Sequence, residues 1–175
     1  QANDHFENSL RLFPDRASTL TNLAVVKIHL KKYDEAKKLA NQSIAIDPEN
    51  FESYLNLGLI EKERKNFEGA IAYFTQATRI NPNYAEGWHN QGIVLNALKR
   101  YPEAIKWYGE AFKLNPNDAN LSTDLAVAYY YTNQPDKALE QFDHSLKLDP
   151  KHAKTLLNQG IVRAFGKQDL DGATA

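Results

Sequence analysis

The sequence predicts an all-α protein, a solenoid of antiparallel helix pairs, from three observations. Pro14, Pro48, Pro82, Pro116 and Pro150 each lie 34 residues after the one before, and periods of roughly 20 to 50 residues indicate stacked supersecondary units. Small residues recur at fixed places between these prolines. Apolar residues recur there too, at the i, i+3, i+4, i+7 spacing of one helix face. We therefore expect each unit to bury its apolar face against its neighbours rather than in one central core.

Placing each of these prolines at position 32 of a 34-residue unit divides the chain into repeats. Complete units are expected at 17–50, 51–84, 85–118 and 119–152. Residues 1–16 are expected to be the second helix of a partial unit, and residues 153–175 an incomplete unit. Because neither end offers a recognisable capping unit and the initiator methionine is missing, we expect a fragment of a longer protein.

Each unit is expected to hold two helices, over positions 2–14 and 18–30, with small and bulky side chains in separate columns. Position 8 is small in every unit: Ala24, Gly58, Gly92, Ala126 and Gly160. Position 20 is always alanine: Ala2, Ala36, Ala70, Ala104 and Ala138. Position 24 is aromatic in four units: Phe6, Phe74, Tyr108 and Phe142. Small residues facing large ones at fixed offsets predict helices whose side chains interdigitate.

Prolines and polar residues mark where the helices are expected to begin and end. Pro102 and Pro135 stand at the expected starts of second helices, and proline is favoured in a first helical turn. An acid or amide precedes four of the periodic prolines: Asp47, Asn81, Asn115 and Asp149. Because the residue before a proline is disfavoured in helical geometry, we expect the second helices to end there.

These residues resemble the tetratricopeptide repeat. Its unit of about 34 residues follows the pattern W-x2-L-G-x2-Y, then A-x3-F, then P. Trp88, Gly92, Ala104, Tyr108 and Pro116 match that pattern, and the resemblance extends over the whole chain. It implies a right-handed superhelical solenoid whose first helices line the concave face.

The composition argues against several classes of partner. The chain has 21 basic and 22 acidic residues and a net charge of −1, so it lacks the basic excess expected of a nucleic-acid-binding protein. Its uninterrupted apolar stretches are too short for a membrane span, and we expect no membrane insertion. Cysteine is absent, which excludes disulfides and thiolate chemistry and fits a reducing compartment. We therefore expect a cytoplasmic protein.

Catalytic motifs are missing as well. The sequence contains no phosphate-binding loop and no nucleophile-elbow motif. The five histidines form no pair at metal-ligand spacing. We therefore expect no enzymatic activity, no cofactor and no bound metal.

Position 6 carries four amides and one acid: Asn22, Asn56, Asn90, Asp124 and Asn158. This position lies on the side of the first helix opposite the packing positions 4, 8 and 11. Each amide offers donors and an acceptor to an extended peptide backbone. The column is similar to the asparagine ladders of O-linked N-acetylglucosamine transferase and kinesin light chain, which hold extended peptides. A second interpretation is that these side chains satisfy local backbone groups.

The residues beside this column differ along the chain. Glu52, Glu63 and Glu86 come from the second and third units, and Tyr130 and Tyr131 from the fourth. They predict a ligand with basic residues over the middle units and an apolar or aromatic anchor near the fourth. The alternatives are a solvated helix face for the glutamates and helix packing for the tyrosines.

Together these patterns predict a protein–protein interaction module that binds an extended peptide segment of a partner protein in its concave groove. One alternative is the substrate-selecting array of a larger enzyme, such as a protein glycosyltransferase. Another is a scaffold that self-associates through its uncapped ends.

Overall fold

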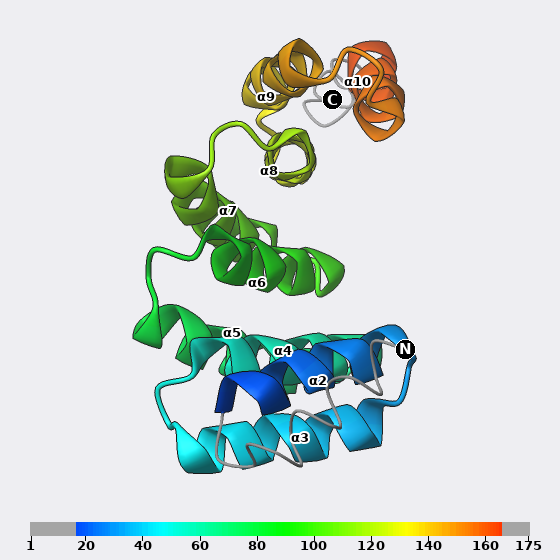
Figure 1. Ribbon diagram of the computed structural model, residues 1–175. Coiled ribbons are helices and arrows are strands. Elements are labelled where there is room, and N and C mark those ends of the chain that lie inside the picture. The colour runs from blue at the N-terminus through cyan, green and yellow to red at the C-terminus, as the bar shows by residue number, and fades with distance from the viewer. Residues whose placement is uncertain (1–16, 166–175) are drawn as a thin grey trace. The chain divides into compact units, whose positions relative to one another are not determined.

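A computed structural model describes residues 17–165 of the chain, and within this range it contains nine α-helices and no strand (Figure 1). The first helices of the expected repeats are α2 (Ala17–His29), α4 (Phe51–Glu63), α6 (Ala85–Ala97), α8 (Ala119–Tyr131) and α10 (Ala153–Phe165). The second helices are α3 (Tyr33–Ile46), α5 (Phe67–Ile80), α7 (Tyr101–Leu114) and α9 (Pro135–Leu148). Each helix begins one residue before its expected start, and the predicted all-α helical repeat is confirmed. The partial unit expected over residues 1–16 lies outside the described residues.

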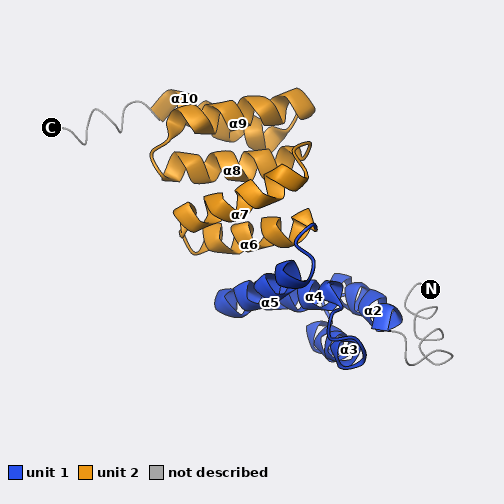
Figure 2. Ribbon diagram, turned by 90° about the vertical axis from the view of Figure 1, so that its left-hand side faces the viewer, with its two compact units in different colours: residues 1–83 blue, residues 84–175 orange. Residues whose placement is uncertain are grey.

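The chain divides into two compact units, residues 1–83 and 84–175 (Figure 2). The described part of unit 1 contains α2 to α5, and that of unit 2 contains α6 to α10. Helices that follow one another within a unit pack together. The first helices also contact each other, α2 with α4 in unit 1, and α8 with both α6 and α10 in unit 2. Each unit therefore has a row of first helices.

Glycine allows the two helices of a repeat to approach closely. The ring of Phe74 on α5 lies against Gly58 on α4, and the ring of Tyr108 on α7 lies against Gly92 on α6. Both aromatic side chains are fully buried. A Cβ atom added at Gly58 would lie 2.5 Å from Cε1 of Phe74, well inside van der Waals contact. The predicted pairing of small position 8 with large position 24 is thus a direct contact.

Buried hydroxyl groups connect three helices at the junction of consecutive repeats. The Oγ1 atom of Thr21 on α2 lies 2.9 Å from Oγ of Ser43 on α3 and 2.8 Å from Oγ of Ser53 on α4. The same arrangement recurs in unit 2 with Thr123, Ser145 and Thr155. Since each hydroxyl has a partner, these polar groups are buried without an unpaired donor or acceptor.

This hydroxyl cluster explains part of the sequence pattern. Serine stands at position 27 where position 5 is threonine, as in the units that contain Ser43 and Ser145. Where position 27 is Ala77 or Ala111, position 5 is Leu55 or His89 instead. The two positions therefore change together along the chain because their side chains touch.

The turns between the helices of a pair share one backbone conformation. Each has a residue with a positive φ angle at position 15: Lys31, Lys65, Lys99 and Asn133. The amide after it bonds back to the helix, as Asn66 N does to the Glu61 carbonyl at 2.9 Å, and this closes the end of the first helix. The second helices end where predicted, directly before Asp47, Asn81, Asn115 and Asp149.

Alanine substitution at two glycines of unit 2 tests the close helix approach. At Gly92, an added Cβ would lie 2.5 Å from Cδ1 and 3.0 Å from Cζ of Tyr108. We expect Gly92→Ala to lower the free energy of unfolding by about 1–2 kcal/mol, because overpacking outweighs the gain in helix propensity. At Gly109, no atom lies within 4 Å of the added Cβ, so Gly109→Ala is expected to raise stability by up to about 1 kcal/mol. Urea unfolding of both variants measures the difference, and a stabilising Gly92→Ala would contradict the packing argument.

Candidate functional site

In unit 1, the position-6 column has one exposed and one buried member. Asn22 on α2 is exposed, while Asn56 on α4 is only 5% exposed. The Nδ2 atom of Asn56 donates a hydrogen bond of 3.3 Å to the carbonyl oxygen of Thr21. Because α2 and α4 lie side by side, this amide joins two neighbouring first helices. For Asn56, the geometry favours the second interpretation, in which the amide satisfies a backbone group.

In unit 2, the column becomes more accessible toward α10. Asn90 on α6 is buried, and its Nδ2 atom donates to the carbonyl oxygen of Glu86 at 3.0 Å. Asp124 on α8 is 9% exposed. Asn158 on α10 is half-buried, and its side chain forms no hydrogen bond with another residue between 17 and 165. Asn158 is thus the member of unit 2 whose amide is available to a ligand.

Asp124 is held by one charged or titratable side chain from each neighbouring first helix. Its Oδ2 lies 3.0 Å from Nε2 of His89 on α6, and its Oδ1 lies 2.5 Å from Nζ of Lys154 on α10. Burial alone would raise the pKa of Asp124, but the bonds from His89 and Lys154 outweigh it and keep this pKa below its usual range. Asp124 is therefore ionised at neutral pH and connects the three helices of the row.

The ionised Asp124 also determines the proton position on His89. A carboxylate only accepts hydrogen bonds, so Nε2 of His89 must carry the hydrogen that it donates. In the neutral imidazole, Nδ1 then remains an acceptor. The ring of Tyr108 packs against the His89 ring edge to face, with 5.7 Å between centroids, and helps to fix its orientation.

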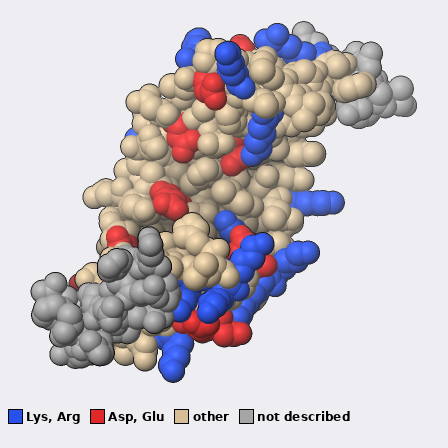
Figure 3. All heavy atoms as spheres, turned by 45° about the vertical axis from the view of Figure 1, so that its right-hand side comes forward, with Lys and Arg blue, Asp and Glu red and all other residues tan. Residues whose placement is uncertain are grey.

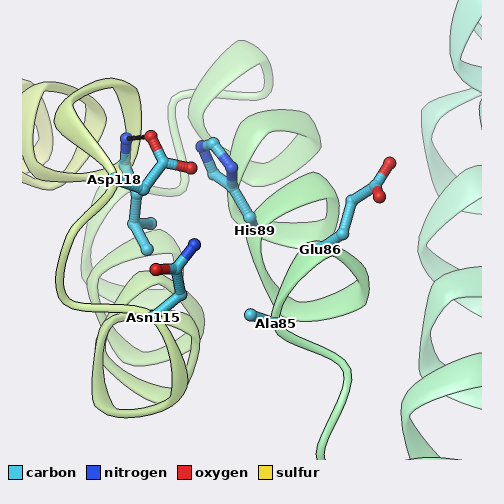
Figure 4. Close-up of a pocket in the computed structure, with 6 residues that line it drawn as sticks. Ala85, Glu86, His89, Asn115 and Asp118 are labelled. Carbon is cyan, nitrogen blue, oxygen red and sulfur yellow. Dashed lines mark hydrogen bonds between the residues drawn. The ribbon is translucent and has the colours of Figure 1, made fainter.

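A pocket of about 270 Å³ lies between α6, the end of α7 and the start of α8 (Figure 4). Its lining residues are Ala85, Glu86, His89, Asn115, Asp118 and Leu121. Glu86, predicted as a site residue, lines the pocket, but Figure 4 shows its carboxylate directed away from His89. The Oε2 atom of Glu86 accepts a hydrogen bond of 2.9 Å from the Tyr84 hydroxyl. The Asp118 carboxylate is the acidic group that faces His89 across the pocket.

A second, smaller pocket of about 60 Å³ lies among α8, α9 and α10. It brings together three predicted site residues, Tyr130, Tyr131 and Asn158, with an apolar lining that includes Val127 and Ile161. We call it the tyrosine pocket. The amide of Asn158, a member of the position-6 column, therefore lies next to an apolar cavity.

The two tyrosines have different surroundings. Tyr131 is 57% exposed, yet its ring stacks on Tyr101 with 4.6 Å between centroids. Tyr130 is half-buried and packs against the core cluster around Phe142. Tyr130 therefore contributes to packing and lines the pocket, while Tyr131 presents a fixed ring to solvent. The binding role of both tyrosines remains a prediction.

The two glutamates of unit 1 are exposed on α4, Glu52 in its first turn and Glu63 at its last residue. Neither of the two pockets described above includes them. Figure 3 shows basic and acidic side chains interspersed on the face that it presents. The binding roles of Glu52 and Glu63 remain predictions.

The profile of the tetratricopeptide repeat matches residues 15–83 and 83–151 of this chain. The chain belongs to the tetratricopeptide repeat (TPR) family. TPR proteins are typically interaction modules without enzymatic activity, so membership supports a role in binding other proteins. No curated protein matches the sequence at a significant level.

Solved TPR structures share this fold. YrrB, described as a TPR protein with an unusual peptide-binding site, superposes with a TM-score of 0.81 at 21% identity, covering 95% of this chain and 86% of its own. MamA superposes with a TM-score of 0.75 at 21% identity, covering 87% of this chain and 89% of its own. A thermophilic TPR protein of Thermus thermophilus superposes with a TM-score of 0.73 at 22% identity, covering 93% of this chain and 89% of its own. At these identities the likeness concerns the fold.

Residues 17–165 contain neither a membrane-spanning helix nor a metal-binding cluster of side chains. No helix there combines the length and apolar character needed to cross a membrane. In the same range, no three His, Asp or Glu side chains come together in an arrangement that could hold a metal ion.

Several residues of the TPR chain's two pockets were not predicted from the sequence. Asn115, Asp118 and His89 occupy positions 31, 34 and 5, which are far apart in a single repeat. They meet because the turn before α8 lies against the first turns of α6. A spacing of 35 residues between His89 and Asp124, one repeat plus one residue, is the sequence signal that could have identified their contact.

The charge of Asp124 predicts a pH-dependent stability. Since its pKa is lower in the folded chain than the ordinary value of 3.8, its contribution is complete above the unfolded pKa and is lost as the pH falls through the folded value. We expect Asp124→Asn to lower the free energy of unfolding by about 1–2 kcal/mol at pH 7, and this loss to shrink below about pH 4. Urea unfolding at pH 7 and pH 3 measures it, with the exposed Asp149→Asn as control. An equal loss at both pH values would show that Asp124 acts through its shape and not its charge.

Proposed function

We propose that this TPR chain binds an extended peptide segment of a partner protein along the row of first helices in unit 2. The observation that carries the proposal is the tyrosine pocket, where the amide of Asn158 lies beside a cavity lined by Val127, Tyr130 and Ile161. An amide suits the backbone of an extended peptide, and an apolar cavity suits one of its side chains. The pairing of the two supports a peptide ligand over a purely apolar one.

The surroundings of the tyrosine pocket also support binding. The ring of Tyr131 is fixed by stacking on Tyr101, with an interplanar angle of 11°, so little side-chain freedom would be lost when a ligand binds. Tyrosine combines a large contact area with a polar end, which suits a surface that is wet before binding. Ile161 is 41% exposed and Phe165 on the same helix is 57% exposed, and they extend the apolar surface of α10.

A disordered segment of the partner fits this surface better than a folded domain. Such a segment can extend along helices, and it is ordered only when it binds. A cytoplasmic location for this interaction remains a prediction from the absence of cysteine. The contribution of Asn22, Glu52 and Glu63 in unit 1 also remains a prediction.

Selection of peptides tests the proposed function. Peptides from a random library are selected on the full chain, and their affinity is then measured for Asn158→Ala and for Tyr131→Ala. We expect each variant to bind the selected peptides about 5- to 30-fold more weakly, as loss of one hydrogen bond or one aromatic contact implies.

Asn117→Ala is the matched control for this test, because Asn117 is an exposed amide in the turn before α8 and lines neither pocket. It should leave peptide affinity within about twofold. Peptides that bind all three variants as well as they bind the parent would overturn the proposal. Far-ultraviolet circular dichroism of each variant checks that its helices are intact.

A further inference from the structure

The pocket between α6 and α8 differs from the tyrosine pocket because its lining includes acidic and polar side chains but no positively charged one. Its polar lining consists of Glu86, His89, Asn115 and Asp118, and no Lys or Arg lines it. Lys154, which is bonded to Asp124, does not line the pocket. The lining therefore contains two acidic residues and no Lys or Arg. The Asp118 carboxylate is the one that faces the cavity, because that of Glu86 is bonded to the Tyr84 hydroxyl and directed away from His89.

Asp118 offers one carboxylate oxygen to the pocket and uses the other for the fold. Its Oδ1 accepts hydrogen bonds from the backbone amides of Asn120 at 2.8 Å and Leu121 at 3.2 Å, at the start of α8. Its Oδ2 accepts no hydrogen bond from any residue between 17 and 165. Figure 4 shows this second oxygen directed toward His89, across the pocket. The capping bonds fix the side chain, so Oδ2 is an acceptor held in place.

His89 and Asn115 also line the pocket. In the neutral imidazole of His89, the hydrogen that Nε2 donates to Asp124 leaves Nδ1 as an acceptor. The amide of Asn115 forms no side-chain hydrogen bond within the described residues, and it can turn its oxygen toward the pocket. Ala85 and Leu121 supply apolar contact beside these groups.

This arrangement suits a guanidinium group. Arginine has five N–H donors in a plane, no acceptor and a permanent positive charge. Several acceptors placed around one cavity can bind those donors together, and the apolar residues can cover the methylene groups of the side chain. Lysine has a single compact ammonium group and would reach fewer of the acceptors at once.

We propose that this pocket is a receptor for an arginine side chain of the bound partner. The proposal deepens the proposed function and rests on it, since the arginine would belong to the peptide that lies along α6, α8 and α10. It places a basic residue of that peptide toward α6 and an apolar residue toward the tyrosine pocket.

Titration with single blocked amino acids tests the arginine receptor separately from peptide binding. The probes are N-acetylarginine methylamide and N-acetylcitrulline methylamide, which have the same shape but differ in charge. Amide chemical shifts of the ¹⁵N-labelled chain are followed for Glu86, His89 and Leu121. We expect saturable shifts with the arginine probe and at least about tenfold weaker binding of the citrulline probe. Equal binding of the two probes would overturn the proposal.

Asp118→Asn is the variant that isolates the charge. Asparagine is as good an N-cap as aspartate, so the variant keeps the start of α8 while it loses the carboxylate. We expect it to bind the arginine probe about tenfold more weakly. Asp149→Asn removes the same charge from an exposed site in the same unit and should change binding less than about twofold. If the two variants lose the same affinity, the probe is attracted by the net charge of the chain alone, and the proposed arginine site is wrong.

A third variant guards against a folding defect in Asp118→Asn. Asn115 is exposed, and Asn115→Ala should weaken binding of the arginine probe about two- to fivefold. An unchanged affinity would count against the site. Because the probes are too small to reach the tyrosine pocket as well, the two proposals can fail separately. Arginine binding without any selected peptide would refute the peptide function, and selected peptides without arginine binding would refute this receptor.

Discussion

The contact between a glycine and an aromatic ring determines how the helices of this protein can be arranged. Where Phe74 lies on Gly58 and Tyr108 lies on Gly92, the two helices of a repeat approach so closely that a Cβ atom has no room. This contact commits one side of α4 to α5 and one side of α6 to α7. The opposite side is then left for neighbouring first helices and for ligands, and both pockets described above involve residues of that side.

The row of first helices in unit 2 depends on a second interaction, the bonds that Asp124 forms with His89 and Lys154. Since these residues come from α6, α8 and α10, one buried carboxylate links three helices. Removing one partner from a buried charged group is costly because the other charge stays unpaired. In unit 1, the equivalent contact is the neutral bond from Asn56 to the Thr21 carbonyl. The same position thus stabilises the row by different means in the two units.

Much of the helical repeat could be predicted from the sequence, because it follows from local rules. The residue before each periodic proline ends a helix, as Asp47 and Asn115 do, since that geometry depends only on neighbours in the chain. The pairing of Gly92 with Tyr108 was also predictable, because helix periodicity places both on facing sides.

The accessibility of the site was harder to predict, because it depends on how closely first helices approach each other. Periodicity placed Asn56 and Asn90 away from the packing face, but it could not show that they are only 5% and 7% exposed in the folded chain. The pocket beside His89 was missed for a related reason. Asp118 caps α8 with one carboxylate oxygen, and its second oxygen gains a role only from the helix across the pocket.

The most direct test of this account is to map where a selected peptide contacts the chain in solution. In a cross-saturation experiment, the peptide protons are irradiated and the loss of signal is recorded on the labelled chain. Binding along the row of first helices predicts the strongest losses on α8 and α10, at Tyr130, Asn158 and Ile161. Strongest losses on the second helices α7 and α9 would contradict it and would place binding on the other side of the repeats.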